Sequence, residues 1–266
     1  MRERPITACG GSPKLGGAAL TDRLSTSAVA ELWRGRSPQG KALAVKIARP
    51  GQVWPIRREA ACLARIRHPA VVPLHSCATT HCGRAALVMP LLPGPSLAVR
   101  LQAGALSEAE AVGLARRLLA ALAAIEAGGL VHRDVAPNNI VLVDGRADRA
   151  VLVDFGLACR APTRAGRRFC GRLAFAAPEQ LGLFGGRIDG RADRYALGLV
   201  LARASGLSVP MGDTPDCARQ HRQAMPCLRG APATLRPLLA AVLAPDPDQR
   251  PARASDALAL LPTQER

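Results

Sequence analysis

The chain has 266 residues, and 48% of them are hydrophobic, which is enough for the core of one large domain or of two small lobes. No apolar run reaches the ~18 uncharged residues of a membrane span, and the N-terminus lacks the apolar stretch of a secretory signal. We therefore expect a cytoplasmic protein without a membrane span. The eight cysteines are too sparse and irregular for a disulfide framework and are expected to be reduced thiols.

The formal net charge of +16 invites an interpretation as a nucleic-acid-binding protein. Nearly all of the positive charge is arginine, spread from end to end among abundant alanine, glycine and proline, as is typical of a GC-rich genome. Only 3% of the residues are aromatic, so side chains for base stacking are scarce. We therefore expect no nucleic-acid partner and favour acidic partners, attracted through electrostatic steering.

The first third of the chain is predicted to be rich in strands. Residues 1–19 contain much glycine and proline without periodicity, which predicts a flexible tail. In the strand expected at residues 43–47, alternation places Ala44 and Lys46 on one face and three larger aliphatic side chains on the other. A small residue beside a lysine suits a nucleotide base next to its phosphates.

One helix is predicted within this region. Pro55 is expected to open it, because proline fits the first helical position. A stripe runs from Ile56 to Arg67, and Glu59 lies off that stripe. Two further strands are predicted at residues 71–74 and 85–89.

The rest of the chain is predicted to be mostly helical. Residues 90–95, with three prolines and a glycine, predict a hinge between two lobes. Ser107 and Glu110 form the pattern of a capping box before a long amphipathic helix, which Gly128 and Gly129 end. Short strands are expected at residues 140–143 and 151–153, and further helices at residues 191–204, 233–244 and 252–261.

These elements predict an α+β fold of two lobes with a cleft at the hinge. The small lobe, about residues 20–89, is rich in strands and has one helix. The larger lobe, about residues 96–262, is mostly helical.

Four short motifs occur in an informative order. They are His132-Arg133-Asp134, Asn139, Asp154-Phe155-Gly156 and Ala177-Pro178-Glu179. The only two asparagines of the chain, Asn138 and Asn139, lie together in this region, and one of its three lysines, Lys46, lies in the segment Ala44-Val45-Lys46-Ile47. This set resembles the signature of protein kinases, most specifically between His132 and Glu179. The resemblance covers about residues 20–262 and is to serine/threonine kinases of the eukaryotic-like (Hanks) type found in bacteria.

The resemblance implies transfer of the γ-phosphate of ATP, with Mg²⁺, to serine or threonine hydroxyls of protein substrates. Asp134 would accept or orient the hydroxyl proton. Asn139 and Asp154 would supply the hard oxygen ligands that Mg²⁺ prefers. Lys46 would hold the α- and β-phosphates, and Glu59 would fix Lys46 through an ion pair.

The resemblance also implies contacts to the adenine base. Leu32, Ala44 and Val141 would sandwich the base, Met89 would be the gatekeeper, and Leu91 would lie in the segment that offers backbone groups to the base. The supporting positions of the signature are Phe155, Gly156, Glu179, Asp193 and Arg250. Of these, Asp193 would brace the backbone of the catalytic loop, and Arg250 would pair with Glu179.

The activation segment follows Gly156. In the family, the arginine at the position of Arg133 normally binds a phosphorylated residue of this segment. Thr163 is the only residue with a hydroxyl group between Gly156 and Ala177. Thr163 is therefore the candidate phosphorylation site.

The glycine-rich loop of the family is missing. Ser25, Ser27 and Ala30 occupy its three glycine positions, where glycine lets the backbone approach the phosphates. If one or two of these positions required a positive φ, each would cost about 1–2 kcal/mol. Nucleotide affinity would then fall roughly ten- to a few-hundredfold.

A second departure concerns the phosphate and the hydroxyl. Serine/threonine kinases usually carry a lysine where this chain has Ala136, and a threonine where it has Arg172. We hypothesise that Arg172 replaces the missing lysine's charge; the alternative is an arginine that only reflects composition. Ala136 also resembles tyrosine kinases, but Pro137 and the Ala-Pro-Glu motif without a tyrosine-type insert favour serine/threonine specificity.

Other cysteine and histidine residues are weak candidates for a metal site or a redox switch. Four residues that can bind metal fall close together, but their spacing fits no zinc pattern; they are His75, Cys77, His81 and Cys82. Cys159 and Cys170 flank the activation segment and are expected to be free thiols rather than a redox switch.

Two other functions remain open. The missing loop and Ala136 favour a pseudokinase, a scaffold that binds nucleotide without transfer. A small-molecule phosphotransferase of the aminoglycoside kind would share the His132–Asn139 stretch but not Ala-Pro-Glu or the later arginine.

Overall fold

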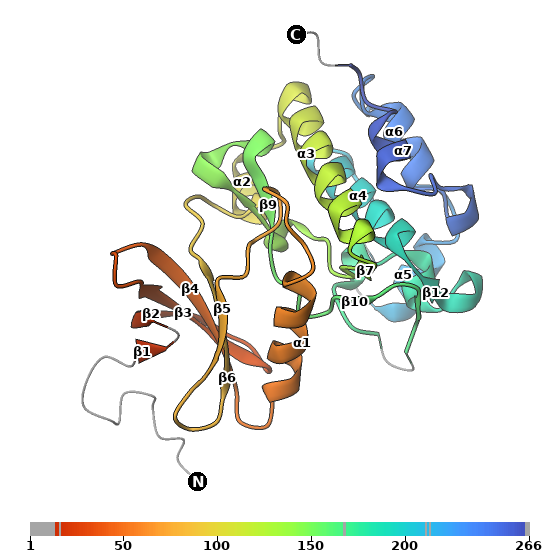
Figure 1. Ribbon diagram of the computed structural model, residues 1–266. Coiled ribbons are helices and arrows are strands. Elements are labelled where there is room, and N and C mark those ends of the chain that lie inside the picture. Colours follow the sequence, from red (N-terminus) through yellow and green to blue (C-terminus); the bar gives the residue numbers. More distant parts are fainter. Residues whose placement is uncertain (1–13, 16, 167–168, 211, 213, 264–266) are drawn as a thin grey trace. The chain divides into compact units, whose positions relative to one another are not determined.

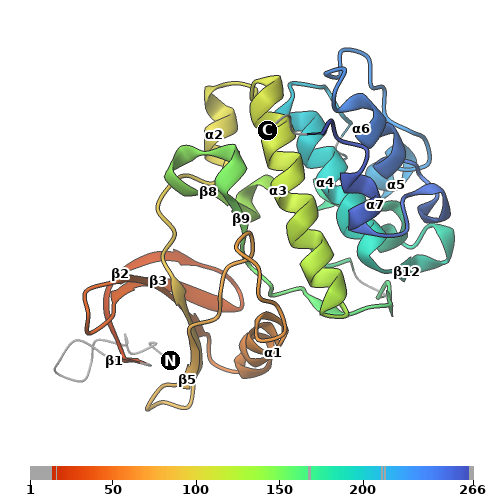
Figure 2. The same cartoon turned by 45° about the horizontal axis from the view of Figure 1, so that its top comes forward.

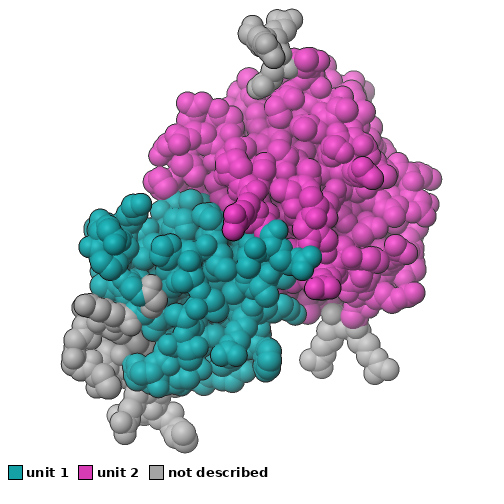
Figure 3. Space-filling view, viewed as in Figure 1, with its two compact units in different colours: residues 1–65, 72–92 teal, residues 66–71, 93–266 magenta. Residues whose placement is uncertain are grey.

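The computed structural model describes residues 14–15, 17–166, 169–210, 212 and 214–263. By their internal contacts, the residues divide into two compact units, shown in different colours in Figure 3. Unit 1 comprises residues 1–65 and 72–92, and unit 2 comprises residues 66–71 and 93–266. Unit 1 is rich in strands and unit 2 is mostly helical, as the sequence predicts.

Unit 1 is built on a six-stranded antiparallel sheet in the order β1-β2-β3-β4-β6-β5 (Figure 1). The helix α1 (Val53–Leu63) packs against β4 and β6. The strands are β1 (Lys14–Leu15), β2 (Ala18–Thr26), β3 (Ala30–Arg36), β4 (Ala42–Ala48), β5 (Ser76–Thr79) and β6 (Ala85–Pro90).

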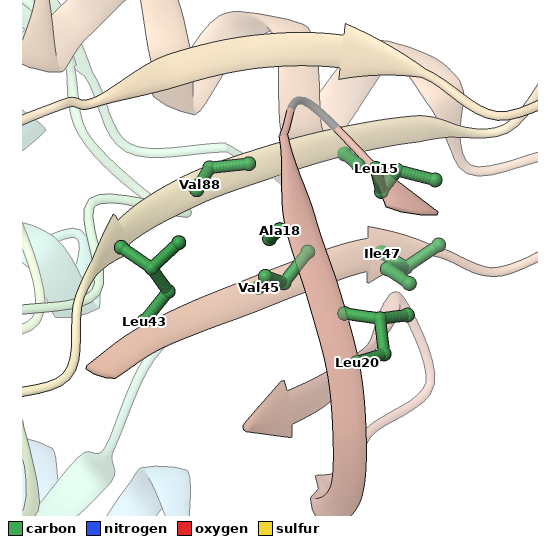
Figure 4. Packing of buried hydrophobic residues seen from close by; sticks show 8 residues of the cluster. Leu15, Ala18, Leu20, Leu43, Val45, Ile47 and Val88 are labelled. Carbon is green, nitrogen blue, oxygen red and sulfur yellow. The ribbon is translucent and has the colours of Figure 1, made fainter. Parts of the chain in front are cut away.

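The core of unit 1 lies on one face of this sheet (Figure 4). Leu43, Val45 and Ile47 of β4 are at most 5% exposed and pack with residues of β1, β2 and β6. Ala44 and Lys46 alternate with them and are only half-buried. The predicted alternation of β4 is confirmed, because every second side chain of a strand reaches the same face.

The expected tail at residues 1–19 is too long. Residues 1–13 and 16 lie outside the described residues, but Leu15 and Ala18 are buried and their strands, β1 and β2, pair with each other. Apolar side chains within this glycine-rich stretch find a place in the core, and their burial outweighs the lack of periodicity.

Two predictions about α1 were wrong. Pro55 is the third residue of the helix rather than the first. Arg67 is exposed and lies beyond the end of the helix at Leu63, whereas Glu59 belongs to the buried face. A buried carboxylate contradicts a stripe chosen for hydrophobicity, and it is tolerated only with a partner.

The strand predicted at residues 71–74 is also absent. Val71 makes a single bridge to Leu152, and the sheet strand is β5, which begins at Ser76. Pro73 interrupts the apolar run and cannot donate a hydrogen bond to a ladder. The strand predicted at residues 85–89 is confirmed as β6.

Unit 2 is organised around the long helix α3 (Glu108–Ala127), against which α4 (Gly190–Ala204) and α7 (Ala254–Leu258) pack (Figures 1 and 2). Ser107 and Glu110 form the predicted capping box, and Gly128 is the C-cap. The other helices are α2 (Leu97–Arg100), α5 (Pro215–His221) and α6 (Arg236–Val242).

The strands of unit 2 form three two-stranded ladders, β7 with β10, β8 with β9, and β11 with β12. They are β7 (Leu130–Val131), β8 (Ile140–Leu142), β9 (Ala150–Leu152), β10 (Cys159–Arg160), β11 (Thr163–Arg164) and β12 (Arg187–Ile188). Single turns of 3-10 helix occupy Leu101–Ala103, Pro137–Asn139, Val143–Gly145, Ala147–Arg149, Leu173–Phe175, Pro178–Leu181, Phe184–Gly186 and Pro247–Gln249.

The predicted helices of unit 2 agree with the structure in place but not always in length. Helix α4 matches closely, whereas α6 and α7 are shorter than expected, and α2 and α5 were not predicted. At Gly198 an added Cβ would lie 2.7 Å from Val242, so glycine permits the close approach of α4 and α6. Among the described residues, no helix has both the length and the apolar character needed to cross a bilayer.

Candidate active site

In unit 1, the Nζ of Lys46 lies 2.7 Å from the Oε2 of Glu59. The side chain of Glu59 is 1% exposed and that of Lys46 is 17% exposed. Strand β4 presents Lys46 on the half-buried face of the sheet, and α1 presents Glu59 from its buried face. Since an unpaired carboxylate would be costly at such depth, the ion pair fixes both side chains.

The hairpin between β2 and β3 contains the three positions where the family has glycine. The N–H of Ser27 donates to the carbonyl of Ala30, and the hydroxyl of Ser27 accepts from the N–H groups of Val29 and Ala30. Neither serine, at positions 25 and 27, nor Ala30 has a positive φ. The strain considered from the sequence therefore does not arise, and the expected loss of affinity has no basis in backbone conformation.

The residues predicted to surround adenine lie in both units. Leu32, Ala44 and Met89 occupy neighbouring strands of unit 1, with Ala44 opposite Met89. The N–H of Leu91 donates to the carbonyl of Ala42, so this donor is already used within the sheet. Val141 belongs to β8 of unit 2, where it is half-buried.

In unit 2, Asp193 of α4 holds the start of the catalytic loop. Its carboxylate accepts from the N–H of His132 at 2.6 Å and from the N–H of Arg133 at 2.8 Å. Burial raises the pKa of Asp193 to about 7, although the two N–H donors act in the opposite direction. The contribution of Asp193 to stability is therefore greatest at low pH and is lost as the pH rises towards 7.

The imidazole of His132 is buried in its neutral form. Its Nδ1 lies 3.2 Å from the N–H of Asp134 and accepts from it, so the proton sits on Nε2, which faces the carbonyl of Val153 at 3.3 Å. The ring meets that of Phe155 edge-on, with centroids 4.5 Å apart. Burial lowers the pKa of His132, and the nearby carboxylates of Asp134 and Asp154 oppose this only in part.

A pH dependence follows from His132. Its pKa in the folded state lies below the ordinary 6.5, so its contribution to stability is present above that value and is lost as the pH falls below it. We expect the free energy of unfolding of wild type, relative to His132→Phe, to fall by up to about 1.4 kcal/mol per pH unit below pH ~6.5. Urea denaturation at several pH values measures this. Asp193 titrates in both proteins, so its effect cancels in the comparison. If the free energies of unfolding of wild type and His132→Phe changed with pH in parallel, the expectation would be wrong.

The carboxylate of Asp134 is held by two side chains. The Nδ2 of Asn139 donates to its Oδ2 at 2.8 Å and to its backbone carbonyl at 2.9 Å, and the guanidinium of Arg172 forms an ion pair with the same Oδ2. The side chain of Asp134 is 12% exposed and that of Arg172 is 38% exposed. The structure thus brings three of the predicted site residues together, because Asn139 and Arg172 both contact the Oδ2 of Asp134.

Backbone strain occurs at two residues of these motifs. Arg133 has a φ of 69° and Asp154 a φ of 61°, which costs about 1–2 kcal/mol for each residue that is not glycine. The Oδ1 of Asp154 lies 3.3 Å from the N–H of Gly156 and accepts from it. Strained backbone of this kind tends to collect at functional sites, where the surrounding structure enforces it.

Arg133 contacts the activation segment and the residue that follows the Ala-Pro-Glu motif. The guanidinium of Arg133 contacts the Sγ of Cys159 at 3.7 Å, and its carbonyl accepts from the Nε2 of Gln180 at 3.0 Å. Thr163 lies in β11 opposite Ile188, which is 1% exposed. The contact to a thiol was not predicted, and phosphorylation of Thr163 stays a prediction.

Glu179 and Arg250 form the ion pair that the signature implies. Two N–H···O bonds of 2.8 and 3.1 Å join the groups, and both side chains are at most 1% exposed. Arg250 also lies over the ring of Tyr195, 4.6 Å from its centroid, and donates to the carbonyls of Ala244 and Pro245. The donors of Arg250 are therefore satisfied by groups of the protein.

Sequence reasoning missed two residues that hold the end of the activation segment. Gln180 joins Arg133 to the N–H of Ala177. Arg222, 2% exposed, donates to the carbonyls of Ala174, Ala176 and Pro210. No signal marked Arg222, because one arginine among so many does not stand out; Gln180, next to the Ala-Pro-Glu motif, could have been noticed.

The cysteine and histidine residues near β5 do not assemble a site. Cys77 and Cys82 are exposed. Over the described part of the chain, no group of three or more histidine, cysteine, aspartate or glutamate side chains is placed to hold a metal ion.

Comparison with known proteins gives a consistent picture. Residues 28–260 match the family model of the protein kinase domain. The chain is 35% identical over 259 residues to CBL-interacting protein kinase 4 of Oryza sativa subsp. japonica, which covers 90% of this chain and 56% of that protein. It is 30% identical over 262 residues to the serine/threonine-protein kinase pkn2 of Myxococcus xanthus, with coverage of 89% and 31%.

The fold is similar to a solved structure as well. Rad53 1-466 in complex with AMP-PNP aligns with a TM-score of 0.75 at 23% identity, over 91% of this chain and 64% of that chain. The present chain spans between about a third and a little over half of the length of its curated relatives named here. From the matched domain and these identities, the chain belongs to the protein kinase family.

Proposed function

We propose that the protein transfers the γ-phosphate of ATP to serine or threonine hydroxyls of protein substrates. The observation that carries the proposal is the arrangement at Asp134, where an amide and a guanidinium fix a carboxylate that remains partly accessible. A carboxylate held in this way can accept a proton from a hydroxyl that is placed against it.

The polar groups of the two units divide the remaining work. Lys46, kept in place by Glu59, supplies the positive charge for the phosphates of ATP. Asn139 and Asp154 would hold Mg²⁺, which neutralises charge on the phosphates when it is bound. Asn139 fits this role, because its Nδ2 makes both of its hydrogen bonds to Asp134 and neither bond uses the Oδ1, which is the atom that a Mg²⁺ ion would need.

Arg172 supports the same reaction. Ala136 offers no charge next to Asp134, whereas the guanidinium of Arg172 is already ion-paired with that carboxylate. A guanidinium has five donors, and 38% of this side chain is exposed. We infer that Arg172 keeps Asp134 oriented and faces the transferred phosphate with its remaining donors.

Substitution of Arg172 tests this role. We expect Arg172→Ala and Arg172→Thr to lower kcat by about 10²–10³, the usual effect of removing one preorganised charge, and Arg172→Lys to lower it less. The measurement is steady-state turnover on a serine peptide. Arg229→Gln, at an exposed arginine in a turn, is the matched control. An unchanged kcat in Arg172→Ala would show that Arg172 only reflects the composition of the chain.

The function itself is tested by transfer of labelled phosphate. Purified protein is incubated with Mg²⁺, γ-labelled ATP and generic protein substrates, followed by phosphoamino-acid analysis. We expect phosphoserine or phosphothreonine with wild type and with Lys41→Ala, and none with Lys46→Ala. Nucleotide binding without transfer would support a scaffold, and label on an aminoglycoside alone would support a small-molecule phosphotransferase.

A further inference from the structure

The activation segment carries charge of one sign. Between Asp154 and Glu179 there are five arginines and no lysine, aspartate or glutamate. They are Arg160, Arg164, Arg167, Arg168 and Arg172. A sixth arginine, Arg187, follows in β12. Whatever meets this segment therefore meets a concentrated positive potential.

Two of these arginines face each other directly. Arg164 of β11 is the cross-strand partner of Arg187 of β12. The N–H of Ala165 donates to the carbonyl of Gly186, so the next pair along the ladder, Arg164 and Arg187, is a pair without mutual hydrogen bonds. Facing side chains are closest in such pairs, with Cα atoms about 4.5 Å apart.

Nothing in the described part of the chain neutralises this pair. Arg164 and Arg187 are exposed, and neither side chain makes a hydrogen bond or an ion pair with any residue that the structure describes. Like charges placed directly opposite each other destabilise a ladder. An anion between the two guanidinium groups removes that repulsion and gains charge-assisted hydrogen bonds.

The pair lies in the unit that contains Asp134. Strand β11 follows β10, whose Cys159 contacts the guanidinium of Arg133. On the other side of the ladder, Gly186 packs against Glu179. A Cβ added at Gly186 would lie 3.8 Å from the carbonyl oxygen of Glu179. One side of the ladder is thus tied to Arg133, the residue before Asp134, and the other to Glu179 of the Ala-Pro-Glu motif, so we expect a peptide bound here to extend towards Asp134.

We propose that Arg164 and Arg187 form an anion-binding site for acidic side chains of the protein substrate. This inference rests on the proposed function and adds the class of sequence that the enzyme prefers. Carboxylates are the favoured ligand, because Arg172 of the same segment already binds one, that of Asp134. Among the phenylalanines of the described residues, Phe155 and Phe175 are buried, Phe169 is half-buried and only Phe184 is exposed, which is too little for base stacking.

The test compares two serine peptides that differ only in flanking residues, glutamate in one and glutamine in the other. For wild type we expect a higher kcat/KM on the glutamate peptide and a loss of this preference at high salt. Arg164→Gln with Arg187→Gln should lower the ratio of the two kcat/KM values by about tenfold, about threefold for each exposed ion pair. The control with equal charge is Arg67→Gln with Arg229→Gln, both at exposed arginines outside the segment, and it should keep the wild-type ratio.

A direct binding measurement separates this inference from the proposed function. Fluorescence anisotropy with a labelled glutamate peptide whose serine is replaced by alanine should show weaker binding to the double variant, even if no transfer is detected with any peptide. Charge reversal, Arg164→Glu with Arg187→Glu, should shift the preference towards a lysine-flanked peptide. Equal ratios and equal binding in wild type and double variant would overturn the site. So would a loss of binding confined to a labelled single-stranded oligonucleotide.

Discussion

Replacement of Asp134 by asparagine is expected to lower kcat by about 10²–10⁴, the range that a positioned acid or base contributes. The amide is nearly the same size as the carboxylate, and its oxygen can still accept from the Nδ2 of Asn139. It cannot take up a proton, and Arg172 loses its ionic partner. Steady-state kinetics should therefore show the loss in kcat, while the Kd for ATP and the free energy of unfolding change little.

The matched control is Asp144→Asn. Asp144 lies in the turn between β8 and β9, where its exposed carboxylate pairs with Arg149. Asparagine tolerates the positive φ of this turn, so the control should keep full activity. If Asp134→Asn retained wild-type kcat, Asp134 would not be the group that receives the hydroxyl proton.

Glu179→Gln is expected to cost about 3–5 kcal/mol of unfolding free energy, because it leaves the charge of Arg250 buried without a counter-charge. Both side chains are at most 1% exposed, so water cannot replace the lost partner. A loss of this size approaches the whole stability of many domains. Urea denaturation followed by circular dichroism measures it.

A double substitution shows whether the cost comes from the unpaired charge. Glu179→Met combined with Arg250→Met removes both charges, and it should cost less than the two single substitutions together. Asp216→Asn, which breaks the exposed ion pair with Arg219, should leave stability almost unchanged. Additive losses in the double variant would indicate that packing, rather than the charge of Arg250, sets the cost.

Much of unit 2 could be predicted because its motifs are patterns of residues that lie close together in the sequence. The capping box at Ser107 and the strands on either side of the Asp144 turn depend on local rules, and both occur in the structure. The spacing from Asp134 to Asn139 spans a single turn, so their hydrogen bond is also a local matter.

Contacts between distant segments were harder to predict. The pairing of Arg172 with Asp134 spans 38 residues of chain, and only the hypothesis about charge replacement anticipated it. The burial of Glu59 contradicts the apolar stripe of α1, since the stripe takes no account of a lysine on another element. Short helices such as α5 could not be predicted, because seven residues are too few to show a helical periodicity.

The hairpin closed by the hydroxyl of Ser27 has a consequence for how such proteins are found. None of Ser25, Ser27 and Ala30 has a positive φ, so the turn of this chain does not require glycine at these positions. A sequence search that requires glycine at those positions would therefore pass over this chain, although its hairpin needs no glycine there.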